Sequence, residues 1–391
     1  MRTTFLWPAA LGAAALILAC DPVDGPNGNK GEATPIVRLG DVAMLLSEIP
    51  IGEGQMGEVF DAVSGSSDNG YDEEYTMASL FECPGRGVGE QTSQTKVSSY
   101  SHPIRSLIDD YFATRTKSDD ILHGADPESF ITGLKASDVQ IYWPYSERWD
   151  GKTAPVITFD PGTGAGVNTG YEMTSKGIRT VLVDEEMAMN RPVWVINRND
   201  DASYKTIEMF RRENPDWAQG GVITVRPGRT KAGKDCRTLV LKDFRMNRNY
   251  DPWFAGASEF WIKCGSLENF TASTEAELKI YSPEITDFLV VIKRGMMGYA
   301  HILNTVLVSE WTDQLDRFAF MIVEDDGGTM TSWKCSCIAK IESKSYGFDL
   351  EIPFRTADDI VWRGQLSRKY FEKDPIVKGH FGDVELSFSF E

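Results

Sequence analysis

From residue 222 to residue 390 the chain is a succession of short, strand-like runs separated by turn residues. Runs of this kind, rich in β-branched and aromatic residues and closely spaced, predict an antiparallel β-sandwich. A sandwich lets each strand bury one face against the opposite sheet. The expected strands are Val222–Val225, Thr238–Phe244, Glu259–Lys263, Ala276–Tyr281, Phe288–Lys293, Phe318–Val323, Lys334–Ile341, Gly347–Ile352 and Val384–Phe390.

The preceding part of the chain has a different pattern. Val42, Leu45, Leu46 and Ile49 recur at the spacing of one helix face, and Tyr71–Glu82 also suggests a helix. Near residue 138 the helical pattern gives way to strand-like runs. We therefore expect an α+β fold with a helical N-terminal part, a mixed central sheet and the C-terminal antiparallel β-sandwich. The expected central strands are Val139–Trp143, Pro155–Phe159, Arg179–Val183 and Val193–Ile196.

Four segments follow from these patterns. Residues 1–19 form an apolar leader, and residues 20–35 are a flexible tether with almost no apolar side chain. Residues 36–228 hold the helices and the mixed sheet, and residues 229–391 hold the sandwich. The boundary between the last two is placed in the turn-rich loop Pro227–Lys234.

The leader ends in Ile17-Leu18-Ala19-Cys20, after an apolar run from Phe5 and a single basic residue, Arg2. This pattern resembles the signal peptide and lipobox of bacterial lipoproteins. The resemblance implies cleavage before Cys20, acylation of its thiol with chains such as palmitate, and anchoring in a membrane on the extracytoplasmic side of the cell envelope. It leaves open whether that membrane is the inner or the outer one. The alternative is an ordinary secretory signal that leaves Cys20 as a free thiol.

Charge and motifs exclude several function classes. The formal net charge is −18, which disfavours binding to nucleic acid phosphates. The chain has four histidines and contains neither H-E-x-x-H nor G-x-S-x-G. The glycine-rich run at residues 162–170 matches no phosphate-binding motif and predicts a surface loop. A hydrolase is left as an alternative, with a site that would be assembled only in three dimensions.

Two acidic loops in the C-terminal part suggest a metal site. Asp251 lies in the loop Asn249–Glu259, and Glu324, Asp325 and Asp326 precede two glycines at the end of a strand. Calcium binds six to eight oxygens, several of them from carboxylates on flexible loops. The arrangement resembles calcium-dependent lipid-binding β-sandwich domains, which implies that these four acids hold Ca²⁺. The alternative is a solvated acidic turn.

Together these features favour a lipid-anchored envelope protein with a binding or structural role over an enzyme. A protein or a glycan is the expected kind of ligand, and the sequence identifies neither the ligand nor the oligomeric state. Tyr142, Trp143, Tyr145 and Trp149 surround a proline-containing turn. We expect these aromatic side chains to fill a core, with a sugar-stacking surface as the alternative.

Overall fold

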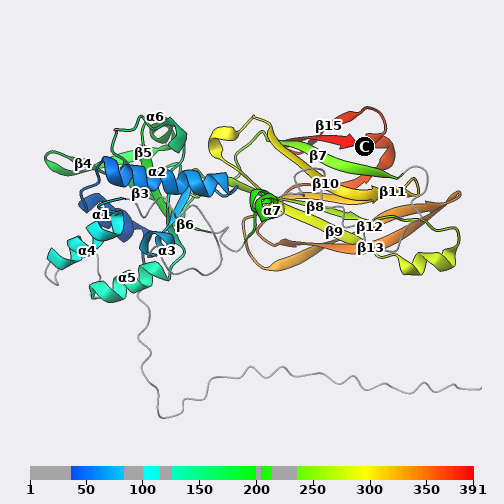
Figure 1. Ribbon diagram of the computed structural model, residues 1–391, viewed down its shortest axis with the longest axis horizontal. Coiled ribbons are helices and arrows are strands. Elements are labelled where there is room, and N and C mark those ends of the chain that lie inside the picture. Colours follow the sequence, from blue (N-terminus) through cyan, green and yellow to red (C-terminus); the bar gives the residue numbers. More distant parts are fainter. Residues whose placement is uncertain (1–36, 83–99, 115–125, 200–203, 214–235) are drawn as a thin grey trace, which may run out of the picture. The chain divides into compact units, whose positions relative to one another are not determined.

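The computed structural model describes residues 37–82, 100–114, 126–199, 204–213 and 236–391 (Figure 1). Helices and a mixed sheet come first and a β-sandwich follows, so the expected α+β fold class is confirmed. We call residues 37–213 the α/β part and residues 236–391 the sandwich. The leader, Cys20, the tether, the expected strand Val222–Val225 and the expected boundary near residue 228 lie outside the described residues.

The α/β part is built on a six-stranded sheet with the strand order β1-β2-β6-β3-β4-β5. Only β3 and β6 run parallel, and the other neighbours are antiparallel. A sheet with one parallel pair matches the mixed central sheet expected from the sequence. Its strands are β1 (Glu74–Thr76), β2 (Val139–Tyr142), β3 (Val156–Phe159), β4 (Val167–Thr174), β5 (Gly177–Asp184) and β6 (Val193–Arg198).

One face of this sheet is buried under helices whose apolar side chains recur at helical spacing. Val42, Leu45 and Leu46 of α1 are fully buried against Trp194 and Ile196 of the sheet. None of the described helices is both long and apolar enough to cross a membrane. The helices of this part are α1 (Leu39–Glu48), α2 (Glu53–Asp68), α3 (Met77–Phe81), α4 (Ile104–Thr114), α5 (Pro127–Lys135), η3 (Ser146–Arg148), α6 (Glu185–Asn190) and α7 (Ile207–Glu213).

The expected helix over Tyr71–Glu82 is only partly correct. Glu74–Thr76 form β1, because their backbone pairs with β2, and only Met77–Phe81 are helical. Thr76 separates the two elements, since its hydroxyl accepts a hydrogen bond from Ser79 N at 3.2 Å and caps α3. A cap therefore marks the helix start that apolar spacing alone placed too early.

The opposite face of the sheet carries a second apolar core. Side chains alternate along a strand, so Val193 and Val195 face away from the helices, beside Tyr142. Trp253 and Phe254, from the loop between β7 and β8, pack into this core. Of the four aromatic residues around the proline-containing turn, Tyr142 and Tyr145 lie in this core, Trp143 lies in the core under the helices, and Trp149 is half-buried against the latter. The first three are at most 5% exposed, as expected for core residues.

The sandwich consists of two sheets that enclose a large aromatic core. One has the order β10-β7-β16-β15 and the other β13-β12-β11-β8-β9, with β14 also paired to β11. The strands are β7 (Arg237–Met246), β8 (Ser258–Ser266), β9 (Glu284–Ile292), β10 (His301–Trp311), β11 (Leu315–Glu324), β12 (Met330–Ile341), β13 (Lys344–Arg355), β14 (Asp359–Ser367), β15 (Ile376–Phe381) and β16 (Val384–Phe390). Three short helices interrupt them, η5 (Glu275–Ile280), η6 (Arg294–Met296) and α8 (Arg368–Phe371).

One expected strand of the sandwich is wrong. Residues 276–281 belong mainly to the helix η5, because the sequence Thr274-Glu275-Ala276-Glu277 starts a helical turn. The Glu277 carboxylate reaches back and accepts a hydrogen bond from Ser273 N at 2.7 Å. None of the η5 residues is buried, and Ile280 is 60% exposed, so this run lacks the buried face of a core strand.

The hairpin of β12 and β13 forms a third layer. β11 pairs with β12 only near Leu315 and Arg317, and from Arg317 to Glu324 it pairs with β14 instead. The hairpin thereby leaves the sheet and covers its outer face, where Ile352 packs with Met321 and Val323. Both faces of β11 are consequently buried.

Candidate metal centre

The last core-facing residue of β11 is an acid, Glu324. Phe318, Phe320 and Ile322 point into the sandwich core, and strand alternation puts Glu324 on the same side. Glu324 is fully buried, and among the described residues only neighbouring acids, Asp251 and Asp326, lie within hydrogen-bonding reach of its carboxylate. A buried carboxylate charge without a compensating partner destabilises a fold, so we expect Glu324 to be protonated or to bind a cation.

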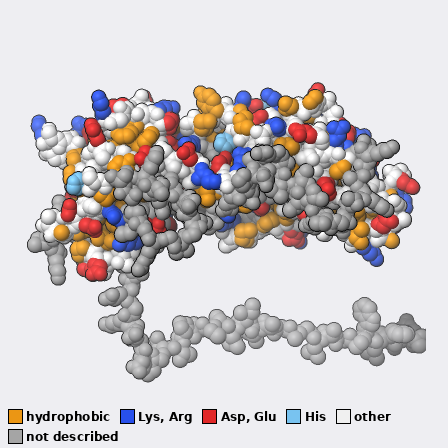
Figure 2. Space-filling model, viewed as in Figure 1, with side chains coloured by type: hydrophobic (Ala, Val, Ile, Leu, Met, Phe, Trp, Pro, Cys, Tyr) orange, Lys and Arg blue, Asp and Glu red, His pale blue; other side chains and the backbone are white. Residues whose placement is uncertain are grey.

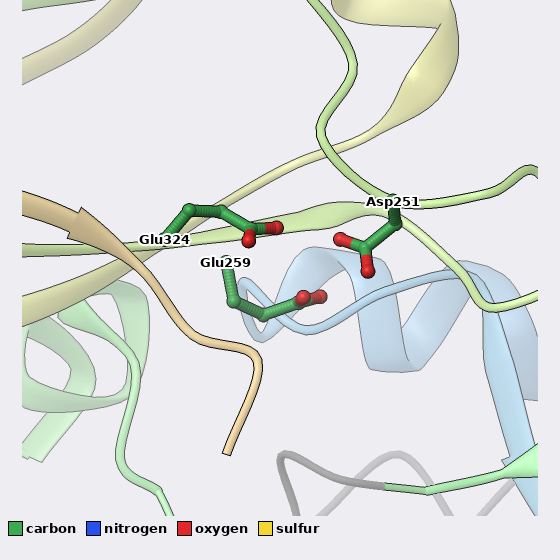
Figure 3. A group of neighbouring side chains, drawn as sticks. All are labelled: Asp251, Glu259 and Glu324. Atoms are coloured by element: carbon green, nitrogen blue, oxygen red, sulfur yellow. The ribbon is translucent and has the colours of Figure 1, made fainter. Parts of the chain in front are cut away.

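Two further acids converge on Glu324. Glu259 is the second residue of β8, the strand beside β11, and Asp251 lies on the loop that leads into β8. One ligand oxygen from each of the three acids lies within 4.8 Å of the other two. Figure 3 shows their carboxylates directed into one shared space. We call Asp251, Glu259 and Glu324 the acidic cluster.

The surroundings keep Glu324 protonated when no cation is bound. Burial raises the pKa of Glu324 from 4.5 to about 11, together with a hydrogen bond to Asp251 and the nearby charges of Asp251 and Asp326. Two carboxylates share a hydrogen bond only when one of them carries a proton. The cluster therefore holds a proton at neutral pH that a divalent cation is able to replace.

Asp325 is turned away from the cluster, unlike the expectation for a ligand. Its carboxylate accepts hydrogen bonds from Trp261 Nε1 at 3.2 Å and Gly327 N at 3.1 Å, and it pairs with Arg355 at 3.4 Å. Burial opposes ionisation, but these donors outweigh it, and the pKa of Asp325 lies below its usual value. Its negative charge is already compensated.

Asp326 was expected as a ligand but is not a member of the acidic cluster, whereas Glu259 is a member that the sequence did not suggest. Asp326 is exposed, yet its charge contributes to the raised pKa of Glu324, so it lies at the rim of the cluster. Glu259 is 7% exposed and was not expected as a ligand. The signal that could have found it is its place at the end of the loop Asn249–Glu259, which also holds Asp251.

The dimensions of the cluster allow a divalent cation. Ligand oxygens on opposite sides of a calcium ion are about 4.6–5.2 Å apart, and about 4.0–4.2 Å apart around magnesium. One oxygen from each acid lies within 4.8 Å of the other two, which accommodates either ion, so the kind and number of ligands decide between them. Three carboxylates supply up to six oxygens, and Asp251 is partly exposed, which leaves room for water ligands.

The other candidate sites have fewer features of a ligand-binding or metal-binding site. In the glycine-rich run, residues 162–166 form an exposed loop, but β4 begins at Val167, so no helix start is available for a phosphate. Among the described residues the acidic cluster is the only group of three or more potential metal ligands this close together. On the face shown in Figure 2, other acidic side chains are scattered among basic ones.

Comparison with known proteins gives no relative for this chain: no protein-family model, no curated protein and no solved structure matches it.

Proposed function

We propose that this protein is a lipid-anchored binding protein of the bacterial cell envelope that holds a calcium ion in its acidic cluster. The observation that carries the calcium proposal is Glu324, a fully buried carboxylate whose nearest charged neighbours are other acids. A calcium ion bound between the acids compensates these charges. Asp251 and Glu259 supply the remaining protein ligands.

The anchor is proposed from the leader alone. Ile17-Leu18-Ala19-Cys20 has the order of a lipobox, and the polar residues 21–35 provide a tether between lipid and folded chain. Acylation with two or more chains makes such anchoring stable. The membrane is then the first partner of the protein, and a protein or glycan ligand is the expected second one.

A binding role is favoured over hydrolysis because the candidate nucleophile, Cys335, is protonated and the candidate acid, Glu324, is buried. An open pocket of about 620 Å³ lies on the β12–β13 hairpin and includes Cys335. Burial raises the pKa of this thiol to about 11, so it is not a thiolate at neutral pH. Glu324, the acid with the most perturbed pKa, is fully buried and out of reach of a substrate.

Calorimetry with calcium tests the proposal. The full chain in detergent is titrated with Ca²⁺ beside Glu324→Gln and the matched control Glu342→Gln, an exposed acid in the turn between β12 and β13. We expect one calcium per chain in the wild type and in Glu342→Gln, and at least about tenfold weaker binding in Glu324→Gln. Equal affinity in all three proteins would show that calcium, if bound, is held elsewhere.

A further inference from the structure

The loop that carries Asp251 is held largely by the α/β part. Trp253 and Phe254 lie in the apolar core beneath Tyr142 and Val195, and they are 4% and 0% exposed. The Trp253 indole also donates a hydrogen bond to the Gly166 carbonyl at 2.9 Å. Trp253 and Phe254, which follow Asp251 and Pro252, are therefore fixed in the core of the α/β part and not in the core of the sandwich.

Two polar side chains of the α/β part bind the backbone of the same loop. The Asn197 amide, 1% exposed, donates to the carbonyls of Phe254 and Ala255. Asp72 accepts a hydrogen bond from Ala257 N at 2.9 Å. Buried hydrogen bonds of this kind fix the position of a loop, because their loss leaves polar groups unsatisfied.

Arg294 connects Asp251 itself to the α/β part. Its Nη1 donates to the main-chain carbonyl of Asp251 at 2.8 Å, and its Nε pairs with Glu185 at 2.7 Å. Arg294 is only 8% exposed, and Glu185 belongs to α6. The Arg294 guanidinium thus holds the backbone of Asp251, and Glu185 of the α/β part holds the guanidinium.

We propose that contacts with the α/β part set the calcium affinity of the acidic cluster, with Glu185 and Asn197 of that part and Arg294 of the sandwich as positioning residues for Asp251. This inference rests on the proposed calcium site. Asp251 is the one member of the cluster on a loop, whereas Glu259 and Glu324 lie on paired strands. Asp251 can coordinate calcium only while its loop is in place. The observed calcium affinity therefore falls in proportion to the fraction of time that the loop is in place.

The test compares calcium affinities of variants that lie outside the cluster. Glu185→Gln weakens the hold on Arg294, and Asn197→Asp removes both amide donors at nearly constant size. The control is Glu172→Gln, an acid of the α/β part that is also paired with arginines, Arg179 and Arg191. Calorimetry with the full chain should show about tenfold weaker calcium binding for the first two variants and no change for the control.

Asn197→Asp separates positioning from long-range charge. The variant adds a negative charge to the loop's surroundings, which by Coulomb attraction alone would tighten calcium binding. Weaker binding therefore supports positioning, and tighter binding refutes it. Trp253→Phe, which keeps an aromatic ring in the core and removes the bond to Gly166, is the milder third variant should either of the others fail to fold.

The two proposals fail in different ways. A wild-type chain that binds no calcium overturns the calcium site and this inference together. A wild-type chain that binds calcium, with the same dissociation constant in Glu185→Gln, Asn197→Asp and Trp253→Phe, overturns the inference alone. Melting midpoints recorded with chelator show whether each variant is destabilised to the same degree as Glu172→Gln, so that lost stability is not mistaken for lost affinity.

Discussion

The raised pKa of Glu324 predicts that the calcium-free protein loses stability as the pH rises. In the unfolded chain Glu324 ionises near its ordinary pKa of 4.5, whereas in the folded protein its pKa is about 11. Between these values the folded state binds the extra proton, so the free energy of unfolding falls with increasing pH. The stabilising contribution is complete below pH 4.5 and is lost progressively above it.

The size of this effect follows from the two pKa values. From pH 5 to pH 7 the folded carboxyl keeps its proton while the unfolded one loses it. The expected loss from Glu324 is about 2.5 kcal/mol, or about 1.4 kcal/mol per pH unit once the unfolded group is ionised. Glu58 and Glu73, whose pKa values burial raises to about 7, act in the same direction. The difference between wild type and Glu324→Gln isolates the Glu324 contribution, since both proteins contain the other two acids.

The assay is urea unfolding at pH 5 and pH 7 with chelator present, followed by circular dichroism. Wild type should lose about 2.5 kcal/mol more than Glu324→Gln over this interval. At pH 7, calcium at about one hundred times its dissociation constant should return about 2.7 kcal/mol to the wild type. An equal pH dependence in the two proteins would refute the reasoning, because it would mean that folded Glu324 ionises normally.

Three further outcomes are expected. Cys20→Ser should abolish incorporation of labelled palmitate and move the protein out of the detergent phase; unchanged partitioning would place the anchor elsewhere. Gly265→Ala should lower stability by about 1–3 kcal/mol, because a Cβ there would lie 2.2 Å from Leu350 Cδ1, and adding Leu350→Ala should relieve the clash. Trp253→Ala should cost about 3–5 kcal/mol in urea unfolding, as expected for a buried indole, and a loss below 1 kcal/mol would contradict its role in the core.

Strand alternation and helical spacing were sufficient for the fold class but not for every element. Phe318–Val323 was readable as a strand because its side chains are apolar on both faces, a consequence of the covering hairpin. His301–Trp311, Asp359–Ser367 and Ile376–Phe381 of the sandwich were missed, as was Val167–Thr174 of the central sheet. The three sandwich strands carry exposed apolar residues, Ile302 at 60%, Ile360 at 40% and Ile376 at 55%, which blur the alternation of buried and exposed positions. Pairing with a distant strand, which sequence does not display, determines their structure.

Only part of the acidic cluster was predictable from the sequence, again because contacts between residues distant in the chain are not visible there. Asp251 and Glu324 were recognised as acids at loop and strand ends, and the structure brings them together. The partners of Asp325, Trp261 and Arg355, were not predictable, since they lie far from it in sequence. Adjacent acids on a strand end point to opposite sides, so Glu324 and Asp325 could not both face one ion.

The departure of the β12–β13 hairpin from its sheet has a consequence for local opening. Because β14 takes the place of β12 beside β11, the open end of the hairpin, residues 330–334 with 351–355, can detach without breaking the β8–β11–β14 ladder. The amides of this open end should then exchange with deuterium as one unit, faster than those of β8 and β11. Each such opening would uncover Met321 and Val323, a patch of strand that is apolar on its outer face. The hairpin is thus both a layer of the fold and the shield that keeps an aggregation-prone surface out of water.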